Sequence, residues 1–145
     1  MSGGSLRHPH FQIVGLNNYD VYQNITLRNF TGVAVTQDDQ REITLSTNPI
    51  IGFVEINIAI KEIAQIDSLA DAVHVIVRYL LHDYMGGRLS SYNLFFYQLD
   101  GKFYCKIVPR YATSPYFVGY KIAQVQNPQR LAEIAQDISE RLDNQ

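Results

Sequence analysis

The sequence predicts an α+β domain in which an antiparallel sheet carries a long helix and a C-terminal helix on one face. Short β-prone runs follow one another along the chain, and tight-turn sequences join them, which favours antiparallel pairing. Two longer segments repeat apolar residues at helical spacing. The predicted order is therefore strand, hairpin, strand, long helix, hairpin, strand, helix.

The first half of the chain contains the first four predicted strands. Residues 11–16 form a short apolar run. Residues 31–37 and 43–47 alternate apolar and polar side chains around the turn-type insert 38–41, which predicts a hairpin. Residues 53–60 alternate cleanly and predict the next strand.

The long helix is predicted to follow directly. Asp67 or Ser68 can cap its start, with Asp71 in the first turn, and Gly86-Gly87 is expected to stop it. Its apolar stripe consists of Leu69, Ala72, Val73, Ile76, Val77, Leu80 and Leu81.

The second half begins with two aromatic-rich runs, 92–99 and 102–108. Asp100-Gly101 joins them, and this dipeptide is a strong hairpin signal. Residues 116–125 form another β-prone run. Pro128 suits a first helical position, and a C-terminal helix is predicted from Leu131, Ile134, Ala135, Ile138 and Leu142.

Composition excludes several classes of function. The 145 residues carry a net charge of −2, so a nucleic-acid backbone is not an expected partner. Cys105 is the only cysteine, which excludes an intrachain disulfide and a cysteine-based zinc site. We see no apolar run of membrane-spanning length and no signal peptide, so we expect a cytoplasmic protein with no membrane partner.

The most concentrated chemistry is the run His8-Pro9-His10-Phe11-Gln12. In an extended segment His8, His10 and Gln12 project to the same face. An imidazole is a competent nucleophile towards phosphorus, and a glutamine amide can donate to a phosphate oxygen as charge develops. The alternative is an exposed histidine pair near a chain terminus, and spacing alone leaves both readings open.

These residues also carry a family resemblance. The stretch from Gly4 to Ile13 resembles the active-site strand of the galactose-1-phosphate uridylyltransferase branch of the histidine-triad (HIT) superfamily, whose signature is Gly-x-Ser-x-x-His-Pro-His-x-Gln. Phe117-Val118-Gly119-Tyr120, followed by a helix, resembles a second segment of the same transferases. The nearest relatives are expected to be poorly characterised bacterial proteins.

The resemblance implies a fold and roles for individual residues. His10 would be the nucleophile that takes the nucleotidyl group, and Gln12 would stabilise the intermediate. Ser5 and His8 would contact the substrate, although His8 matches a frequent zinc ligand of the family. Residues 1–16 would be the active-site strand of an otherwise missing first repeat, and residues 17–145 a HIT-like domain.

Departures from the family pattern limit this expectation. The strand Phe103 to Lys106 lacks the metal-binding histidine pair of the second repeat, and Lys121 replaces a glutamate. We therefore expect no metal and no cofactor. The implied function is a nucleotidyltransferase-like domain for a nucleotide or nucleotide-sugar, incomplete and weak or inactive alone, resembling a hexose-1-phosphate uridylyltransferase. The alternative is a non-catalytic HIT-like ligand-binding or interaction domain.

Other candidates rank below this motif. Lys106 and Arg110 can reach a phosphate and are candidate substrate-binding residues, although a solvated pair is favoured. His74 is expected at the surface and Cys105 in the core. Tyr92, Tyr97 and Tyr104 are expected to fill a sheet face. The sheet edge left by the missing repeat predicts a homodimer, or pairing with a missing N-terminal half.

Overall fold

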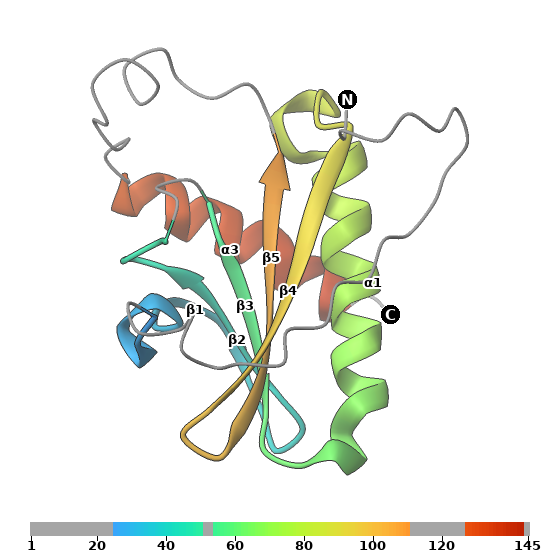
Figure 1. Cartoon of the computed structure of the whole chain (residues 1–145). Coiled ribbons are helices and arrows are strands. Elements are labelled where there is room, and N and C mark those ends of the chain that lie inside the picture. Colours follow the sequence, from blue (N-terminus) through green and yellow to red (C-terminus); the bar gives the residue numbers. More distant parts are fainter. Residues whose placement is uncertain (1–24, 51–53, 111–126, 144–145) are drawn as a thin grey trace, which may run out of the picture.

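A five-stranded antiparallel sheet with helices on one face forms the body of the domain (Figure 1). The structure is a computed structural model and describes residues 25–50, 54–110 and 127–143. The strand order is β1-β2-β3-β5-β4, and every pair is antiparallel. The prediction of an α+β fold is confirmed. The strands are β1 Gly32–Gln37, β2 Glu42–Ser46, β3 Ile56–Ile60, β4 Ser91–Leu99 and β5 Lys102–Arg110, and the two longer helices are α1 Ile66–His82 and α3 Pro128–Asp143.

Both predicted hairpins are present. In the β1–β2 turn, the Asp38 carboxylate accepts hydrogen bonds from the backbone N–H groups of Gln40 and Arg41, at 2.7 and 2.8 Å. In the β4–β5 turn, Asp100 has φ 49° and Gly101 has φ 74°. Two consecutive positive φ values match the two-residue turn whose twist fits the flanking strands. The local sequence at both turns was therefore sufficient to predict the two hairpins.

The helix α1 differs from its prediction at both ends. It begins at Ile66, after a short 3₁₀ turn (η3, Ile63–Gln65), so Asp67 lies in the first turn and does not cap it. It ends at His82, and a second 3₁₀ turn (η4, Tyr84–Gly86) precedes Gly87. The predicted stripe also missed two residues, because Val75 and Tyr79 are buried as well.

The C-terminal helix α3 begins at Pro128, as predicted. The side chain of Asn127 accepts hydrogen bonds from the backbone N–H groups of Gln129 and Arg130, at 3.0 and 3.4 Å. These bonds satisfy donors that have no partner inside a helix. The buried face of α3 consists of Leu131, Ile134, Ala135 and Ile138.

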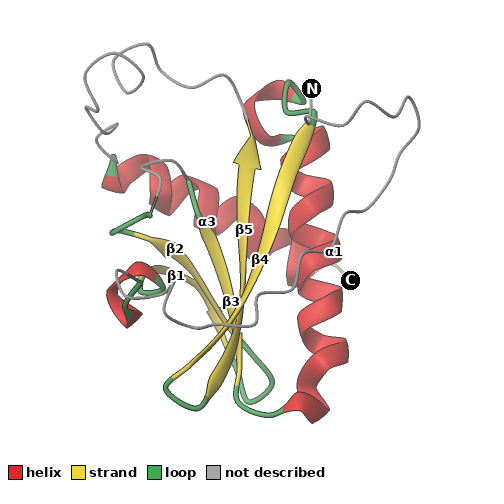
Figure 2. Cartoon of the chain, viewed as in Figure 1, coloured by secondary structure: helices red, strands yellow, loops and turns green. Residues whose placement is uncertain are grey.

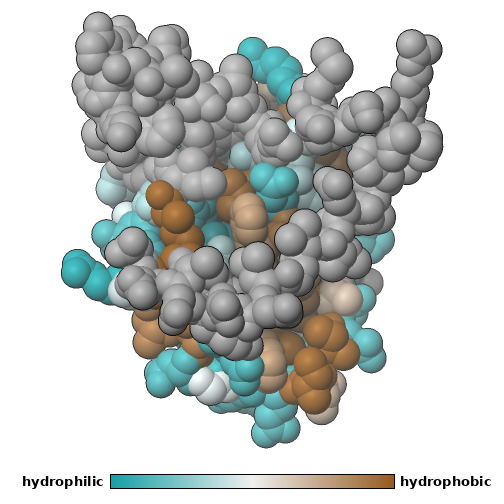
Figure 3. All heavy atoms as spheres, in the orientation of Figure 1, coloured by the Kyte–Doolittle hydropathy of each residue, from teal (hydrophilic) through white to brown (hydrophobic). Residues whose placement is uncertain are grey.

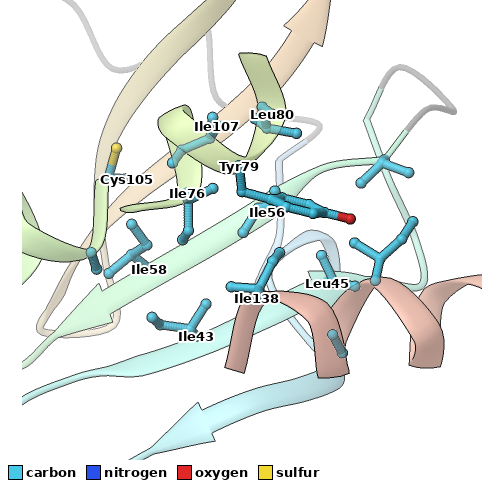
Figure 4. Packing of buried hydrophobic residues seen from close by; sticks show 14 of the residues in the cluster. Ile43, Leu45, Ile56, Ile58, Ile76, Tyr79, Leu80, Cys105, Ile107 and Ile138 are labelled. Atoms are coloured by element: carbon cyan, nitrogen blue, oxygen red, sulfur yellow. The ribbon is translucent and has the colours of Figure 1, made fainter. Parts of the chain in front are cut away.

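The core lies between one face of the sheet and the two helices. Alternate residues of the central strands point towards α1 and α3, and Figure 4 shows them meeting side chains of both helices. The fully buried members shown there are Ile43, Leu45, Ile56, Ile58, Ile76, Leu80, Cys105, Ile107 and Ile138. The remaining positions of the strands therefore face the opposite side, which we call the open face.

The three connections β1–β2, β3–α1 and β4–β5 gather at one end of the sheet (Figure 2). Apolar residues reach the surface at several places among hydrophilic ones (Figure 3). Two of the exposed apolar residues are Phe95 and Phe96 of β4, which are 39% and 61% exposed. Within the described residues, β4 is an edge strand, with only β5 as neighbour.

We expect this edge to pair with a second copy of the chain, because β4 is nine residues long and carries no charged residue or proline that would discourage pairing. Light scattering at micromolar concentration should then report a dimer. Phe96→Lys should shift the protein towards monomer, whereas Ile63→Lys, at a site that is 63% exposed on η3, should not. A wild-type monomer would contradict the prediction.

Some predicted elements lie outside the described residues, namely the strands expected at 11–16 and 116–125. Within the described ranges, no helix has the length and apolar character that a bilayer crossing requires.

Candidate functional site

A row of buried polar side chains crosses the open face of the sheet. Strand register places Thr44 of β2 opposite Asn57 of β3, and Asn57 opposite Lys106 of β5. Their exposed fractions are only 7%, 1% and 1%. Buried polar groups need hydrogen-bond partners, so something must cover and satisfy this row.

Residues 25–31, here called the cover segment, supply these partners. The segment includes a single 3₁₀ turn (η2, Leu27–Asn29) and lies on the open face. The backbone carbonyl of Asn29 accepts hydrogen bonds from Lys106 Nζ and Ser46 Oγ, both at 2.8 Å. The carbonyl of Phe30 accepts one from Thr44 Oγ1, also at 2.8 Å. Three side chains of the sheet thus hold the cover segment through its backbone.

An aromatic cluster completes the attachment. The Phe30 ring is 3% exposed and packs against Tyr97 and Tyr104, with centroids 5.1 and 4.7 Å away. The Lys106 ammonium lies 4.6 Å from the Phe30 centroid, within the range of a cation–π contact. The prediction that Tyr97 and Tyr104 fill a sheet face is confirmed.

Lys106 forms a buried ion pair with Glu55. Its Nζ atom lies 2.7 Å from Glu55 Oε2, and the side chains are 1% and 0% exposed. Burial lowers the pKa of Lys106, and the Glu55 carboxylate opposes that shift. The expectation of a solvated Lys106 was wrong. Because β3 pairs with β5, Glu55, which directly precedes β3, lies next to Lys106. Its role in substrate binding stays a prediction.

A cavity of about 180 Å³ opens beside the polar row. It is bounded by the cover segment, the sheet and the β4–β5 turn, and its lining consists of Leu27, Phe30, Thr31, Glu42, Thr44, Asn57, Ala59, Asp100, Lys102 and Tyr104. Among the described residues, Asn57 Oδ1 has no hydrogen-bond partner. A buried acceptor without a partner costs roughly 1–3 kcal/mol, so this atom requires an explanation.

Charged side chains stand at the rim of the cavity. Lys102 Nζ lies 3.1 Å from Glu42 Oε2, and both side chains are about one-third exposed. The hydrogen bond to Glu42 raises the pKa of Lys102, and burial raises the pKa of the Tyr104 hydroxyl. Lys102 is therefore protonated at neutral pH, and Tyr104 is a neutral phenol there.

The structure locates only some of the residues predicted from sequence. Ser5, His8, His10 and Gln12 lie outside the described residues. Arg110 is the last residue of β5, opposite Ser91.

Sequence reasoning missed Asn57, Thr44 and Glu55. The alternation of residues 53–60 could have indicated two of them. Because positions 54, 56, 58 and 60 are apolar, Glu55 and Asn57 lie together on the other face of an extended segment.

The remaining candidates occupy the places expected of them. His74 is exposed on α1, and Cys105 is fully buried on the helix side of β5. Burial raises the pKa of the Cys105 thiol from its ordinary 9.0 to about 12, so a reactive thiolate is not available near neutral pH.

The Cys105 thiol predicts a stability change in mild alkali. Because folding raises its pKa, the protonated Cys105 thiol contributes to stability in full below about pH 9. This contribution is lost as the pH rises towards 12. Between pH 8 and 10 this residue should remove about 1.4 kcal/mol of unfolding free energy. Urea titrations at several pH values should show this fall in the free energy of unfolding. Cys105→Ala should be less stable at pH 8 but should lose less stability between pH 8 and 10. Equal slopes in both proteins would contradict the assignment.

No metal is expected in the purified protein. Within the described residues, no group of three or more His, Cys, Asp or Glu side chains is placed to hold an ion. A structural zinc takes four such ligands. Elemental analysis of protein purified without a histidine tag should find less than about 0.1 zinc or iron per chain, and a value near one would contradict the prediction.

Comparison with known proteins identifies a family. The model of the DUF4931 C-terminal domain, a domain of unknown function, matches residues 22–142. The crystal structure of a DUF4931 family protein from Bacillus cereus ATCC 10987 is similar, with a TM-score of 0.80 and 44% identity over 97% of this chain. The chain spans 64% of that protein. None of the curated proteins compared with the chain matches it. The chain belongs to the DUF4931 C-terminal domain family.

Proposed function

We propose that this domain binds a small polar ligand in the cavity on its open face. The observation that carries the proposal is the Oδ1 atom of Asn57, which is buried in a residue that lines the cavity and has no partner among the described residues. A ligand that donates a hydrogen bond there would satisfy it. Ligand pockets typically combine apolar and aromatic walls with a few polar groups, as this cavity does.

Binding suits the cavity better than catalysis by its own walls. The ten lining residues that the structure describes include no histidine, cysteine or serine. Burial raises the pKa of the Tyr104 hydroxyl, so at neutral pH it is a protonated phenol and not a phenolate that could act as base or nucleophile. The cavity therefore lacks a nucleophile with an adjacent base, and the role that fits it is to hold and orient a ligand.

The test is a ligand panel followed by amide NMR of the whole chain. The panel contains nucleosides, nucleotides, nucleotide-sugars, free sugars and amino acids. We expect at least one compound to shift the backbone amide signals of Thr44, Asn57, Ala59 and Tyr104 together. The signals of Gln136 and Glu140, exposed on α3, serve as the internal control. A panel without such a compound would overturn the proposal.

Nucleotidyl transfer is the second candidate, favoured by the motif from Gly4 to Ile13. In this proposal the chain is a HIT-like part of a cytoplasmic hexose-1-phosphate uridylyltransferase-like enzyme. His10 attacks the α-phosphorus of a nucleotide-sugar, the bond from that phosphorus to the bridging oxygen breaks, and the sugar phosphate leaves. Gln12 donates a hydrogen bond to the phosphoryl oxygen. The isolated chain would be weak or inactive, because missing substrate-orienting walls cost much of the proximity effect.

Intact mass spectrometry tests this second candidate. The whole chain is incubated with UDP-sugars and ADP-sugars and kept at mildly alkaline pH, where phosphoramidates persist. The transferase proposal expects an adduct of one nucleotidyl group that is absent in His10→Ala and retained in His74→Ala. An adduct retained in His10→Ala would contradict the assignment of the nucleophile.

A further inference from the structure

We propose that the cavity recognises a small ring through amino or hydroxyl groups that donate hydrogen bonds, and that it does not hold a phosphate. This inference rests on the proposed binding function and adds the chemical class of the group that enters the cavity. Three observations carry it: the orientation of one amide, the charges around the cavity, and its size.

The first observation is that the unsatisfied atom is an acceptor. Thr44 Oγ1 gives its proton to the carbonyl of Phe30, 2.8 Å away, so towards Asn57 it can only accept. Asn57 Nδ2 donates to this oxygen at 3.2 Å. The opposite orientation of the amide would place two acceptors against each other. Asn57 Oδ1 is therefore the free atom, and it requires a donor.

The second observation is that the described lining residues offer no unengaged cation to an anion. Lys102 is the one basic residue among the lining residues that the structure describes, and Glu42 already engages it at 3.1 Å. Glu42 and Asp100 contribute two carboxylates, so the described part of the lining carries a formal charge of −1. Lys106 does not line the cavity, and its ammonium donates to Glu55 and to the Asn29 carbonyl. From these described residues a phosphate would meet repulsion without a compensating partner.

The third observation concerns size and shape. A cavity of about 180 Å³ has room for several water molecules, which suits one small ring. Phe30 and Tyr104 contribute aromatic surface to the walls, and Ala59 leaves room above the strand. An amino-bearing nucleobase ring and a free sugar share this chemistry, and the two sources can be distinguished by experiment.

The experiment is an amide NMR titration of the whole chain with matched probes. Cytidine and adenosine carry an exocyclic amino group, whereas uridine and inosine carry an oxygen acceptor at the same ring position. Glucose tests the sugar source, and inorganic phosphate tests an anion. We expect an amino nucleoside or glucose to shift the signals of Thr44, Asn57 and Ala59. An amino nucleoside should bind at least about fivefold more tightly than its acceptor analogue if the ring is a base. Phosphate should leave these signals unchanged.

Two variants test the role of the amide. Asn57→Leu removes the acceptor and should weaken binding of the preferred probe about tenfold or more. Thr44→Val keeps the shape of the side chain, removes the group that orients the amide, and should weaken binding about threefold or more. Wild-type-like spectra outside the cavity establish that each variant is folded. If neither variant folds, the responses of the wild-type signals to the nucleosides, to glucose and to phosphate decide together.

The outcomes separate this inference from the function on which it rests. Phosphate shifting the same signals would overturn the donor preference and leave ligand binding intact. Acceptor analogues binding as well as amino nucleosides would exclude the exocyclic amino group and support a hydroxyl donor, because the analogues keep their ribose hydroxyl groups. Absence of any shift with these probes would overturn the inference. Absence of any shift with the wider panel would overturn the binding function too.

Discussion

Lys106→Met is expected to lower the free energy of unfolding by about 3–5 kcal/mol, because it leaves the Glu55 carboxylate buried without its ammonium partner. The same change removes a donor to the Asn29 carbonyl and the cation beside the Phe30 ring. Chemical denaturation followed by circular dichroism measures the effect.

Two comparisons identify the buried charge as the cause. Lys102→Met breaks an ion pair that is about one-third exposed and should cost less than about 1 kcal/mol. Adding Glu55→Leu to Lys106→Met should recover much of the loss, because it removes the buried carboxylate that has lost the Lys106 ammonium. A double variant that is less stable than Lys106→Met alone would contradict this explanation.

Ile138→Ala should destabilise the fold by about 2–5 kcal/mol. Ile138 is fully buried on α3 and belongs to the cluster that α3 shares with the sheet and with α1. Truncation loses apolar burial and leaves a cavity that the surrounding strands cannot fill. Thermal or urea unfolding measures the effect.

Gln136→Ala, on the exposed side of the same helix, is the matched control and should change stability by less than about 0.5 kcal/mol. Equal effects of the two substitutions would mean that α3 does not depend on its apolar face.

Local signals in the sequence predicted most of the fold. The Asp100-Gly101 turn and the Pro128 helix start depend on the preferences of one or two residues, and both predictions are confirmed. The limits of α1 were less predictable, because its first residue follows a 3₁₀ turn. In that turn Gln65 Oε1 accepts hydrogen bonds from the backbone N–H groups of Lys61 and Glu62. Periodicity alone does not encode such a turn.

The open face was harder to predict, because its interactions join distant parts of the chain. The buried ammonium of Lys106 donates hydrogen bonds to Glu55 and to the carbonyl of Asn29, which lie in two other segments. Neither partner is visible from the sequence around Lys106. The free acceptor of Asn57 depends likewise on Thr44 of β2 and on Phe30 of the cover segment. The predicted residues Ser5, His8, His10 and Gln12 are not among those the structure describes, so their roles stay predictions.

The strand order has a consequence for the rate of folding. The β1–β2 and β4–β5 hairpins close short loops, and isolated hairpins form in about 1–10 μs. The central β3–β5 pairing joins Ile56 to Ile107 and closes a loop that contains the whole of α1. Chain entropy opposes this closure before its contacts are gained, so we expect it to limit the rate. The Lys106–Glu55 pair spans this same junction and forms only after it closes, so Lys106→Met should accelerate unfolding while leaving the folding rate nearly unchanged.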